Sequence, residues 1–559
     1  MTSLLSVAAF DVCGALPTGT TVLEASAGTG KTYTIASLAV RYVAEGHAEL
    51  PELMLVTFGR EATQELRERV RERLGAAERA LRDPAAARAS SDAVIALLAA
   101  VDDAEAARRR ERLTRALAQF DAATIATTHQ FCQQMLAGLG AAGDRDPDAV
   151  FVESIEDLIT EVVDDFYVRK YGDRSAGTPA FTREEALRLA RIAVGDGQAR
   201  LEPRDAEPGS TADVRYRFAT AVRAEVARRK REQRIYTFDD MLTRLAAALA
   251  DPARGAAERL RARFRVVLVD EFQDTDPVQW DILRRAFHGH TTLVLIGDPK
   301  QAIYAFRGAD VRSYLDATEV ADSHATLATN WRSDAPLLDA LAQVFGDVAL
   351  GNERITVHPV GAAHTGQRIP GVPFRVRVLG RVGLPAAKSG LVFAKEARRA
   401  VAADAAADIA ELVAGDTVAP GDVAVLVRTN DQGALMHDAL RAVGVPAVLT
   451  GTSSVFATPV ATEWLQLLEA CEAPRASRLR GAALTCFLGH TVEELCGPDA
   501  DQLLDRIGGQ VRAWGSLLRE RGVAALLEAV TTDTGLPERL LRQAGGERTL
   551  TDLRHIGQL

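Results

Sequence analysis

The chain lacks several features that would place it outside a reducing, aqueous compartment. Its 559 residues include five cysteines, and no two have Cys-x-x-Cys spacing, which argues against a disulfide framework or a zinc site. It has no run of about 18 apolar residues, the length that spans a bilayer. Its start lacks the basic residues of a secretory signal peptide. We therefore expect a cytoplasmic protein with no membrane segment.

Lysine is also scarce, since almost all basic residues are arginine. The six lysines are at positions 31, 170, 230, 300, 388 and 395, and two of them fall inside motifs described below. The net charge of −10 argues against a protein that coats nucleic acid. It does not exclude a DNA channel, because binding depends on local charge. The length predicts several domains.

Short apolar runs that each lead into a helix-like stretch predict the fold class. They occur at 20–24, 52–57, 122–127, 265–270 and 292–297. Strands that alternate with helices imply a mostly parallel sheet covered on both faces. The chain is therefore expected to be an α/β protein.

Two long segments between these runs are expected to be helical. Residues 60–119 carry alanine, arginine and glutamate throughout. Residues 136–232 also have a helical pattern, which Gly, Pro and Asp interrupt near 171–180 and 202–210. The second segment predicts a helical subdomain inserted between strands of one core.

A second α/β unit is expected to begin after Asn330. An alanine-rich helix is predicted at 394–414, and the pattern is helical again from about 462 to the end. Strands are predicted at 374–379, 422–428 and 446–449.

The segment after the first apolar run is expected to bind phosphate. It consists of Ala25, Ser26, Ala27, Gly28, Thr29, Gly30, Lys31 and Thr32. Its glycines let backbone N–H groups close around a β-phosphate, Lys31 reaches the β- and γ-phosphates, and Thr32 binds magnesium. The pattern usually opens with glycine, where this chain has Ala25. The strand before the loop and the helix after it argue against an accidental match, so ATP and Mg²⁺ are the expected cofactors.

A second apolar strand ends in two carboxylates. Asp270 is at the strand end, where a magnesium ligand is expected, and Glu271 beside it is placed to activate the attacking water. An acidic strand end that faces solvent is the alternative. The phosphate loop earlier in the chain favours the catalytic interpretation.

A third element follows the strand at 292–297. Gln301 is placed to sense a γ-phosphate through its amide. Tyr304 and Phe306 put two aromatic rings beside Arg307, and aromatic faces stack on bases with little regard to sequence. Core packing is the alternative for these rings.

These segments resemble the UvrD/Rep-type helicases of superfamily 1. The matching stretches are Asp270–Asp274, Gly297–Gln301 and Ile303–Ala309. Thr57-Phe58 with Ala62, Glu65 and Arg69 resembles motif Ia, Thr127–Cys132 resembles motif Ib, Leu327–Ser333 resembles motif IV, and Phe238–Leu242 matches the segment before the Walker B strand. The loop Glu24–Thr32 and the closing Thr549–Ile556 are most similar to the RecB branch, the motor of the RecBCD exonuclease complex.

The resemblance implies a role for each matching residue. Asp270, Glu271 and Gln301 would act at the ATP site, with Thr32 and Asp270 on magnesium. Arg332 would be an arginine finger, and a surface ion pair is its alternative. The residues that would line a single-strand DNA path are Thr57, Phe58, Thr128, His129, Tyr304, Phe306 and Arg307. For His129 a satisfied core histidine is the alternative, which the sequence alone favours.

The chain departs from the family pattern at several points. Residues 1–24 contain no glutamine that would read adenine, and Thr18 lies about where one would fall, which puts the selectivity for ATP in doubt. Gly59 replaces a frequent threonine of motif Ia. Motifs V and VI are not found, and no lysine follows position 395 to supply motif V. The nuclease domain of RecB is not found either.

The resemblance implies a domain plan for these residues. The first RecA-like ATP-binding domain would comprise 1–135 and 233–325, with the helical subdomain 136–232 inserted. Residues 326–465 would begin a second RecA-like domain, and 466–559 would be part of its helical insertion. The sequence is thus expected to be the N-terminal portion of a longer protein.

Two functions remain open from the sequence. One is an ATP-dependent 3′–5′ single-strand DNA translocase and helicase of RecB type, which acts in double-strand break repair and recombination and is incomplete here. Its partners would be single-stranded or duplex-end DNA and RecC- and RecD-like subunits. The alternative is a truncated ATP-binding subunit that binds DNA or a partner without unwinding. A P-loop ATPase of another class does not account for the segments around Gln301 and Tyr304.

Overall fold

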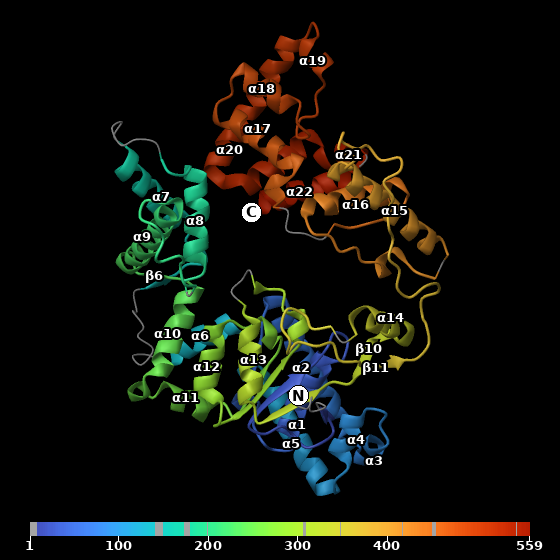
Figure 1. The fold of residues 1–559 in the computed structure, drawn as a ribbon. Helices are drawn as coiled ribbons and strands as arrows, with labels where there is room; N and C mark the ends of the chain where they lie inside the picture. The colour runs from blue at the N-terminus through green and yellow to red at the C-terminus, as the bar shows by residue number, and fades with distance from the viewer. Residues whose placement is uncertain are drawn as a thin grey trace. The chain divides into compact units, whose positions relative to one another are not determined.

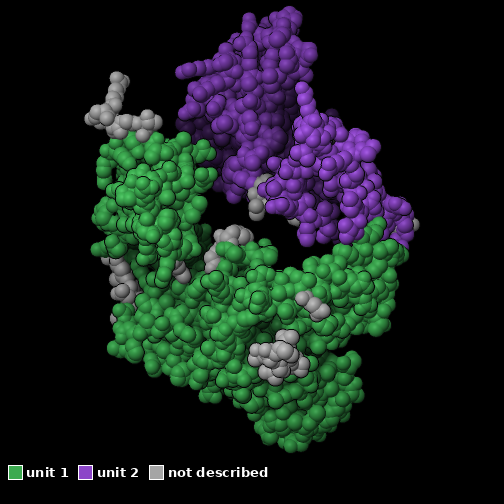
Figure 2. All heavy atoms as spheres, in the orientation of Figure 1, with its two compact units in different colours: residues 1–375 green, residues 376–559 purple. Residues whose placement is uncertain are grey.

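The structure, a computed structural model, divides into two compact units, residues 1–375 and 376–559 (Figures 1 and 2). It describes residues 8–139, 149–172, 179–197, 199–305, 309–346, 348–415, 417–449, 454–543 and 545–559. Among these residues, no helix has both the length and the apolar character that crossing a membrane requires.

A seven-stranded parallel sheet forms the centre of the first unit (Figure 1). In spatial order the strands are β1 (Ala8–Ala9), β9 (Ser323–Thr326), β2 (Thr20–Glu24), β8 (Thr292–Gly297), β7 (Val266–Val269), β3 (Leu53–Thr57) and β4 (Thr124–Thr127). The predicted α/β class is confirmed, and each predicted apolar run of this unit contains a strand. The strands β1 and β9 were not predicted.

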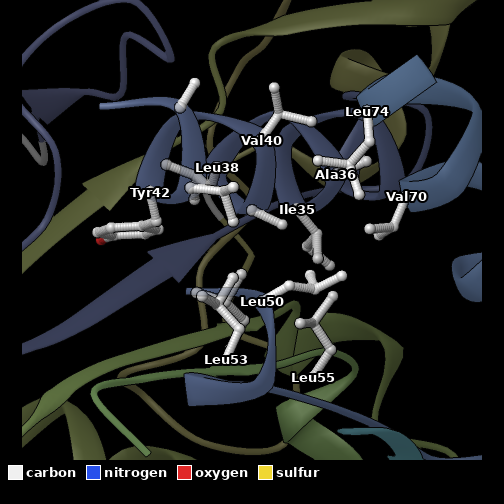
Figure 3. Close-up of a cluster of buried hydrophobic side chains, with 14 of the residues drawn as sticks. Ile35, Ala36, Leu38, Val40, Tyr42, Leu50, Leu53, Leu55, Val70 and Leu74 are labelled. Atoms are coloured by element: carbon white, nitrogen blue, oxygen red, sulfur yellow. The ribbon is translucent and has the colours of Figure 1, made fainter. Parts of the chain in front are cut away.

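Both faces of the sheet are buried, which explains the continuous apolar runs. Successive side chains of β2 and β3 point to opposite faces, so Leu23 and Leu55 enter one core cluster while Val22 and Val56 enter the other. Figure 3 shows the first cluster, in which residues of α1 (Lys31–Ala44), α2 (Arg60–Ala80) and β3 pack together.

Helices cover the two faces. The first cluster also receives residues from α3 (Pro84–Arg88), α4 (Ala93–Ala99) and α5 (Asp103–Ala118). The second receives residues from α6 (Thr128–Leu139), α10 (Phe238–Ala250), α11 (Ala256–Arg263), α12 (Pro277–Phe287) and α13 (Val311–Val320).

The segment between α6 and α10 is largely helical, as predicted. It contains α7 (Glu156–Tyr171), α8 (Arg183–Gly195) and α9 (Thr211–Glu232), which enclose an apolar cluster of their own. A small parallel pair, β5 (Val150–Phe151) and β6 (Ile235–Tyr236), lies at the two ends of this helical segment.

The first unit ends in a short parallel pair with one helix. These elements are β10 (Thr329–Asp334), α14 (Ala335–Phe345) and β11 (Gly361–His364). Residues 326–375, which contain these elements, belong to the same compact unit as the large sheet.

The second unit, residues 376–559, is helical. Its helices are α15 (Ala394–Ala414), α16 (Asn430–Ala442), α17 (Pro459–Glu472), α18 (Ala476–Ala483), α19 (Val492–Cys496), α20 (Ala500–Thr534, with a kink at Gly522), α21 (Leu536–Leu541) and α22 (Gly546–Gln558). The predicted helix 394–414 coincides with α15.

The prediction of strands at 374–379, 422–428 and 446–449 is wrong, because none of these segments is a strand in the structure. Their apolar side chains lie largely in solvent, with Val378 88% and Leu426 95% exposed. A strand requires a neighbouring strand to supply its hydrogen bonds. Among the described residues of the second unit no such ladder forms, so the apolar pattern alone was not sufficient.

Candidate nucleotide site and single-strand path

The predicted phosphate loop joins β2 to α1 at the carboxyl ends of the parallel strands, where α/β sheets bind ligands. Gly28 and Gly30 have φ values of 81° and 85°, which side chains with a Cβ rarely adopt. The Thr29 hydroxyl donates to the Ser26 carbonyl at 2.7 Å. The loop thus leads into the N-terminus of a helix of 14 residues, whose N–H groups favour an anion.

Lys31 and Glu271, which are 240 residues apart in the sequence, are in direct contact. The Lys31 Nζ donates to both carboxylate oxygens of Glu271, at 2.8 and 2.7 Å. Glu271 has a φ of 49°, an uncommon conformation for a residue other than glycine. The structure therefore brings together the predicted phosphate ligand and the predicted base.

Asp270 lies directly after β7, and hydrogen bonds with backbone groups fix its position. Its N–H donates to the Val56 carbonyl at 2.8 Å, and its Oδ1 accepts from the Glu271 N–H at 2.9 Å. Burial raises the pKa of Asp270 to about 6, the negative charge of Glu271 acts in the same direction, and Lys31 opposes both. A cation beside this carboxylate would favour its charged form.

The residues present fit a magnesium ion. Thr32 and Asp270 offer a hydroxyl and a carboxylate, and Mg²⁺ prefers oxygen ligands and usually keeps several waters. In the described part of the chain no group of three or more His, Cys, Asp or Glu could hold a metal by itself.

Gln301 lies in a short turn that follows β8. Its Nε2 donates to Asp298 Oδ2 at 2.8 Å. Lys300 in the same turn pairs with Glu24 at 2.5 Å and with Asp298 at 2.8 Å. Burial acts to lower the pKa of Lys300, but the two carboxylates outweigh it and the pKa is raised. The ion pair between Lys300 and Glu24 therefore holds this turn against the end of β2, directly before the phosphate loop.

The segment that contains Arg332 lies against the phosphate loop. The Asn330 Nδ2 donates to the Ala27 carbonyl at 2.9 Å, and the Trp331 N–H donates to the Gly28 carbonyl at 2.8 Å. A Cβ on Gly28 would lie 2.7 Å from the Cβ of Arg332, so only glycine permits this approach. Arg332 is thus held beside the loop that the sequence assigns to phosphate.

Sequence reasoning gave no role to two residues of this site, although both lie within the matched motifs. Trp331 is 63% exposed, and its Cδ1 lies 3.7 Å from where a Cβ on Gly30 would be. Gln273 is 2% exposed and contacts Glu271. Trp331 could have been noted as an aromatic residue next to a predicted finger. Nothing in the sequence around Gln273 indicates its contacts.

The predicted single-strand path is brought together in part. The rings of Phe58 and Tyr304 lie 4.8 Å apart at 31°, although 246 positions separate them in the sequence. Thr57 is 1% exposed, and its hydroxyl has no hydrogen-bond partner among the residues that the structure describes. Phe306 and Arg307 lie outside the described residues.

Thr128 and His129 begin α6. The His129 ring packs edge-on against Phe238 at 4.8 Å. Burial lowers the pKa of His129, and the carboxylates of Asp239 and Asp276 oppose this effect. His129 is therefore partly packed into the protein beside α10.

The family described as UvrD/REP helicase N-terminal domain matches residues 11–322, more than half of the chain. The chain belongs to this helicase family. It is 48% identical over 563 aligned residues to the RecBCD enzyme subunit RecB of Mycolicibacterium smegmatis, covering 98% of this chain and 51% of that protein. The RecB of Escherichia coli is 37% identical over 386 residues, covering 63% of this chain and 32% of that protein. The chain spans about half the length of the first of these relatives and a third of the second.

Proposed function

We propose that this chain is the N-terminal motor portion of a RecB-type enzyme that uses ATP hydrolysis to move 3′ to 5′ along single-stranded DNA. The observation that carries the proposal is the contact of Lys31 with Glu271 at the carboxyl edge of the sheet. It joins a phosphate ligand to a water-activating carboxylate. Membership of the helicase family supports ATP as the nucleotide.

The roles follow from the chemistry of each group. Lys31 and the N-terminus of α1 would bind the phosphates, and Thr32 and Asp270 would hold the magnesium ion. When bound, Mg²⁺ neutralises charge that develops on the phosphate oxygens. Glu271 takes a proton from the attacking water once Lys31 turns to the phosphates. Gln301 and Arg332 approach the γ-phosphate from the turn after β8 and from β10.

The wider assignment extends the same proposal. Residues 1–135 and 233–325 form the first RecA-like domain, with 136–232 inserted. Residues 326–465 begin the second RecA-like domain, and 466–559 belong to its helical insertion. In the cytoplasm, with RecC- and RecD-like partners, the enzyme acts on duplex ends in double-strand break repair and recombination. The similarity to RecB subunits supports this assignment.

Trp331 gives a first testable consequence, because the chain has no glutamine before the phosphate loop. Its exposed indole offers a stacking face for a base, and stacking contributes about 1–3 kcal/mol per base. Trp331→Ala is expected to weaken ATP and GTP binding by that amount for both nucleotides, since a stacking face reads no hydrogen-bond pattern. Titration of fluorescent ATP and GTP analogues measures this.

The exposed Phe456 provides the control, and Phe456→Ala should leave nucleotide binding unchanged. If Trp331→Ala weakens ATP binding but not GTP binding, the ring is part of a base-specific contact and the stacking account is wrong.

Phe58 and Tyr304 test the DNA path. If their rings stack on bases, Phe58→Ala and Tyr304→Ala should each weaken binding of single-stranded DNA by about 1–3 kcal/mol, with little sequence preference. Anisotropy titrations with oligo-dT and a mixed-sequence strand measure the loss, and melting curves report the fold. A lower melting temperature with unchanged DNA affinity per folded molecule would mean that the rings only pack against each other.

A further inference from the structure

The buried amide of Gln273 connects Glu271 at the nucleotide site with Asp298 in the turn that leads to the predicted DNA path. Its Nε2 donates to Glu271 Oε2 at 2.7 Å, and its Oε1 accepts from the Asp298 N–H at 2.9 Å. The Asp298 N–H can only donate, so the amide oxygen faces Asp298 and the NH₂ group faces Glu271. The glutamine amide supplies both the acceptor and the donor that these two directions require.

The partner of this amide, Asp298, organises the turn that leads to Tyr304. Its side chain accepts from the Lys300 N–H at 3.1 Å and from Gln301 Nε2 at 2.8 Å. Tyr304 follows three residues after Gln301, and its ring lies 4.8 Å from the ring of Phe58. A continuous series of contacts therefore runs from Glu271 through Gln273 and Asp298 toward the aromatic pair.

The backbone at Gly297 is fitted to this amide. A Cβ on Gly297 would lie 2.6 Å from Gln273 Oε1 and 3.1 Å from the backbone nitrogen of Gln273. Both atoms belong to a residue that is 2% exposed and has little room to move aside. The absence of a side chain at 297 thus permits the contact between Gln273 and Asp298.

We propose that Gln273 is a positioning residue that makes ATP hydrolysis respond to single-stranded DNA, by tying Glu271 to the turn Asp298–Gln301. The inference rests on the proposed function, because it requires Glu271 to activate water and Tyr304 to contact the strand. When the strand displaces Tyr304, the turn moves with it. Gln273 transmits that movement to the carboxylate of Glu271.

The test compares the ATPase rate of the whole chain at saturating oligo-dT with the rate without DNA. Gln273→Met removes both hydrogen bonds at similar volume. Gly297→Ala displaces the amide and changes no polar group. Both variants are expected to lower the ratio of the two rates by about fivefold or more, within the range of typical coupling between sites. Gln279→Met is the matched control, since Gln279 is a buried glutamine that bonds to the carboxylate of Asp276, and its ratio should not change.

The possible outcomes separate the two proposals. If DNA does not stimulate hydrolysis by the unaltered chain, the proposed function fails and the inference fails with it. If the unaltered chain is stimulated and Gln273→Met keeps the full ratio, whether or not its two rates fall in parallel, Gln273 does not couple DNA to hydrolysis and the inference alone is overturned. Should Gly297→Ala not fold, the comparison of Gln273→Met with Gln279→Met decides the test.

Discussion

Glu271→Gln is expected to bind ATP at least as tightly as the unaltered chain and to lose its turnover. The carboxylate of Glu271 is bonded to Lys31 through both oxygens, so a nucleotide must compete with it for that ammonium group. The neutral amide introduced by Glu271→Gln competes less with the nucleotide for the Lys31 ammonium group, and it cannot take a proton from water. Loss of a general base costs about 10²–10⁴-fold in rate. Lys31→Ala should abolish hydrolysis by a different route, because it removes the cation that binds the phosphates.

Titration of a fluorescent ATP analogue and a phosphate-release assay distinguish the two variants. Glu111→Gln, at a largely exposed position of α5, is the matched control and should change neither measurement. Unchanged turnover in Glu271→Gln would remove this residue from the reaction. Weaker binding in Glu271→Gln would show that its contact with Lys31 prepares the site instead of competing with the nucleotide.

The large sheet can be predicted from the sequence because each strand is buried on both sides. The apolar run at 292–297 coincides with β8 for this reason. The strand β9 reads Ser-His-Ala-Thr, and it is a strand only because β1 and β2 pair with its two edges. From residue 374 onward the same apolar signal was misleading, since no neighbouring strand is present among the described residues to pair with the runs at 374–379 and 422–428.

Motif spacing predicts which residues gather at the site, but not their contacts. Lys31 and Glu271 are each expected near phosphate, and the structure adds that they bind each other. The hydrogen bonds of Gln273 and Asn330 connect segments distant in sequence, so they depend on the register of the parallel strands. Thr57 is expected on the DNA path, whereas the structure shows a buried hydroxyl at the end of β3.

The chain by itself is expected to bind magnesium-ATP weakly and to show no processive unwinding. Arg332 is the one arginine identified for the γ-phosphate, and well-placed arginines raise phosphoryl-transfer rates about 10³–10⁵-fold. Motifs V and VI are not found in its sequence. Exposed apolar side chains at 374–379 and 422–428 should also make the isolated chain prone to association.

A strand-displacement assay on a duplex with a 3′ overhang, at saturating ATP, tests this expectation. A duplex with a 5′ overhang is the control for direction, and the Lys31→Ala variant is the control for ATP dependence. Nucleotide binding without displacement of either duplex is the expected result, because one ATP-binding face without motifs V and VI cannot convert hydrolysis into steps along DNA, even where DNA stimulates the hydrolysis itself. Robust unwinding of the 3′ substrate would show that these 559 residues suffice for a helicase. Arg332 and the turn after β8 would then perform the roles expected of motifs V and VI.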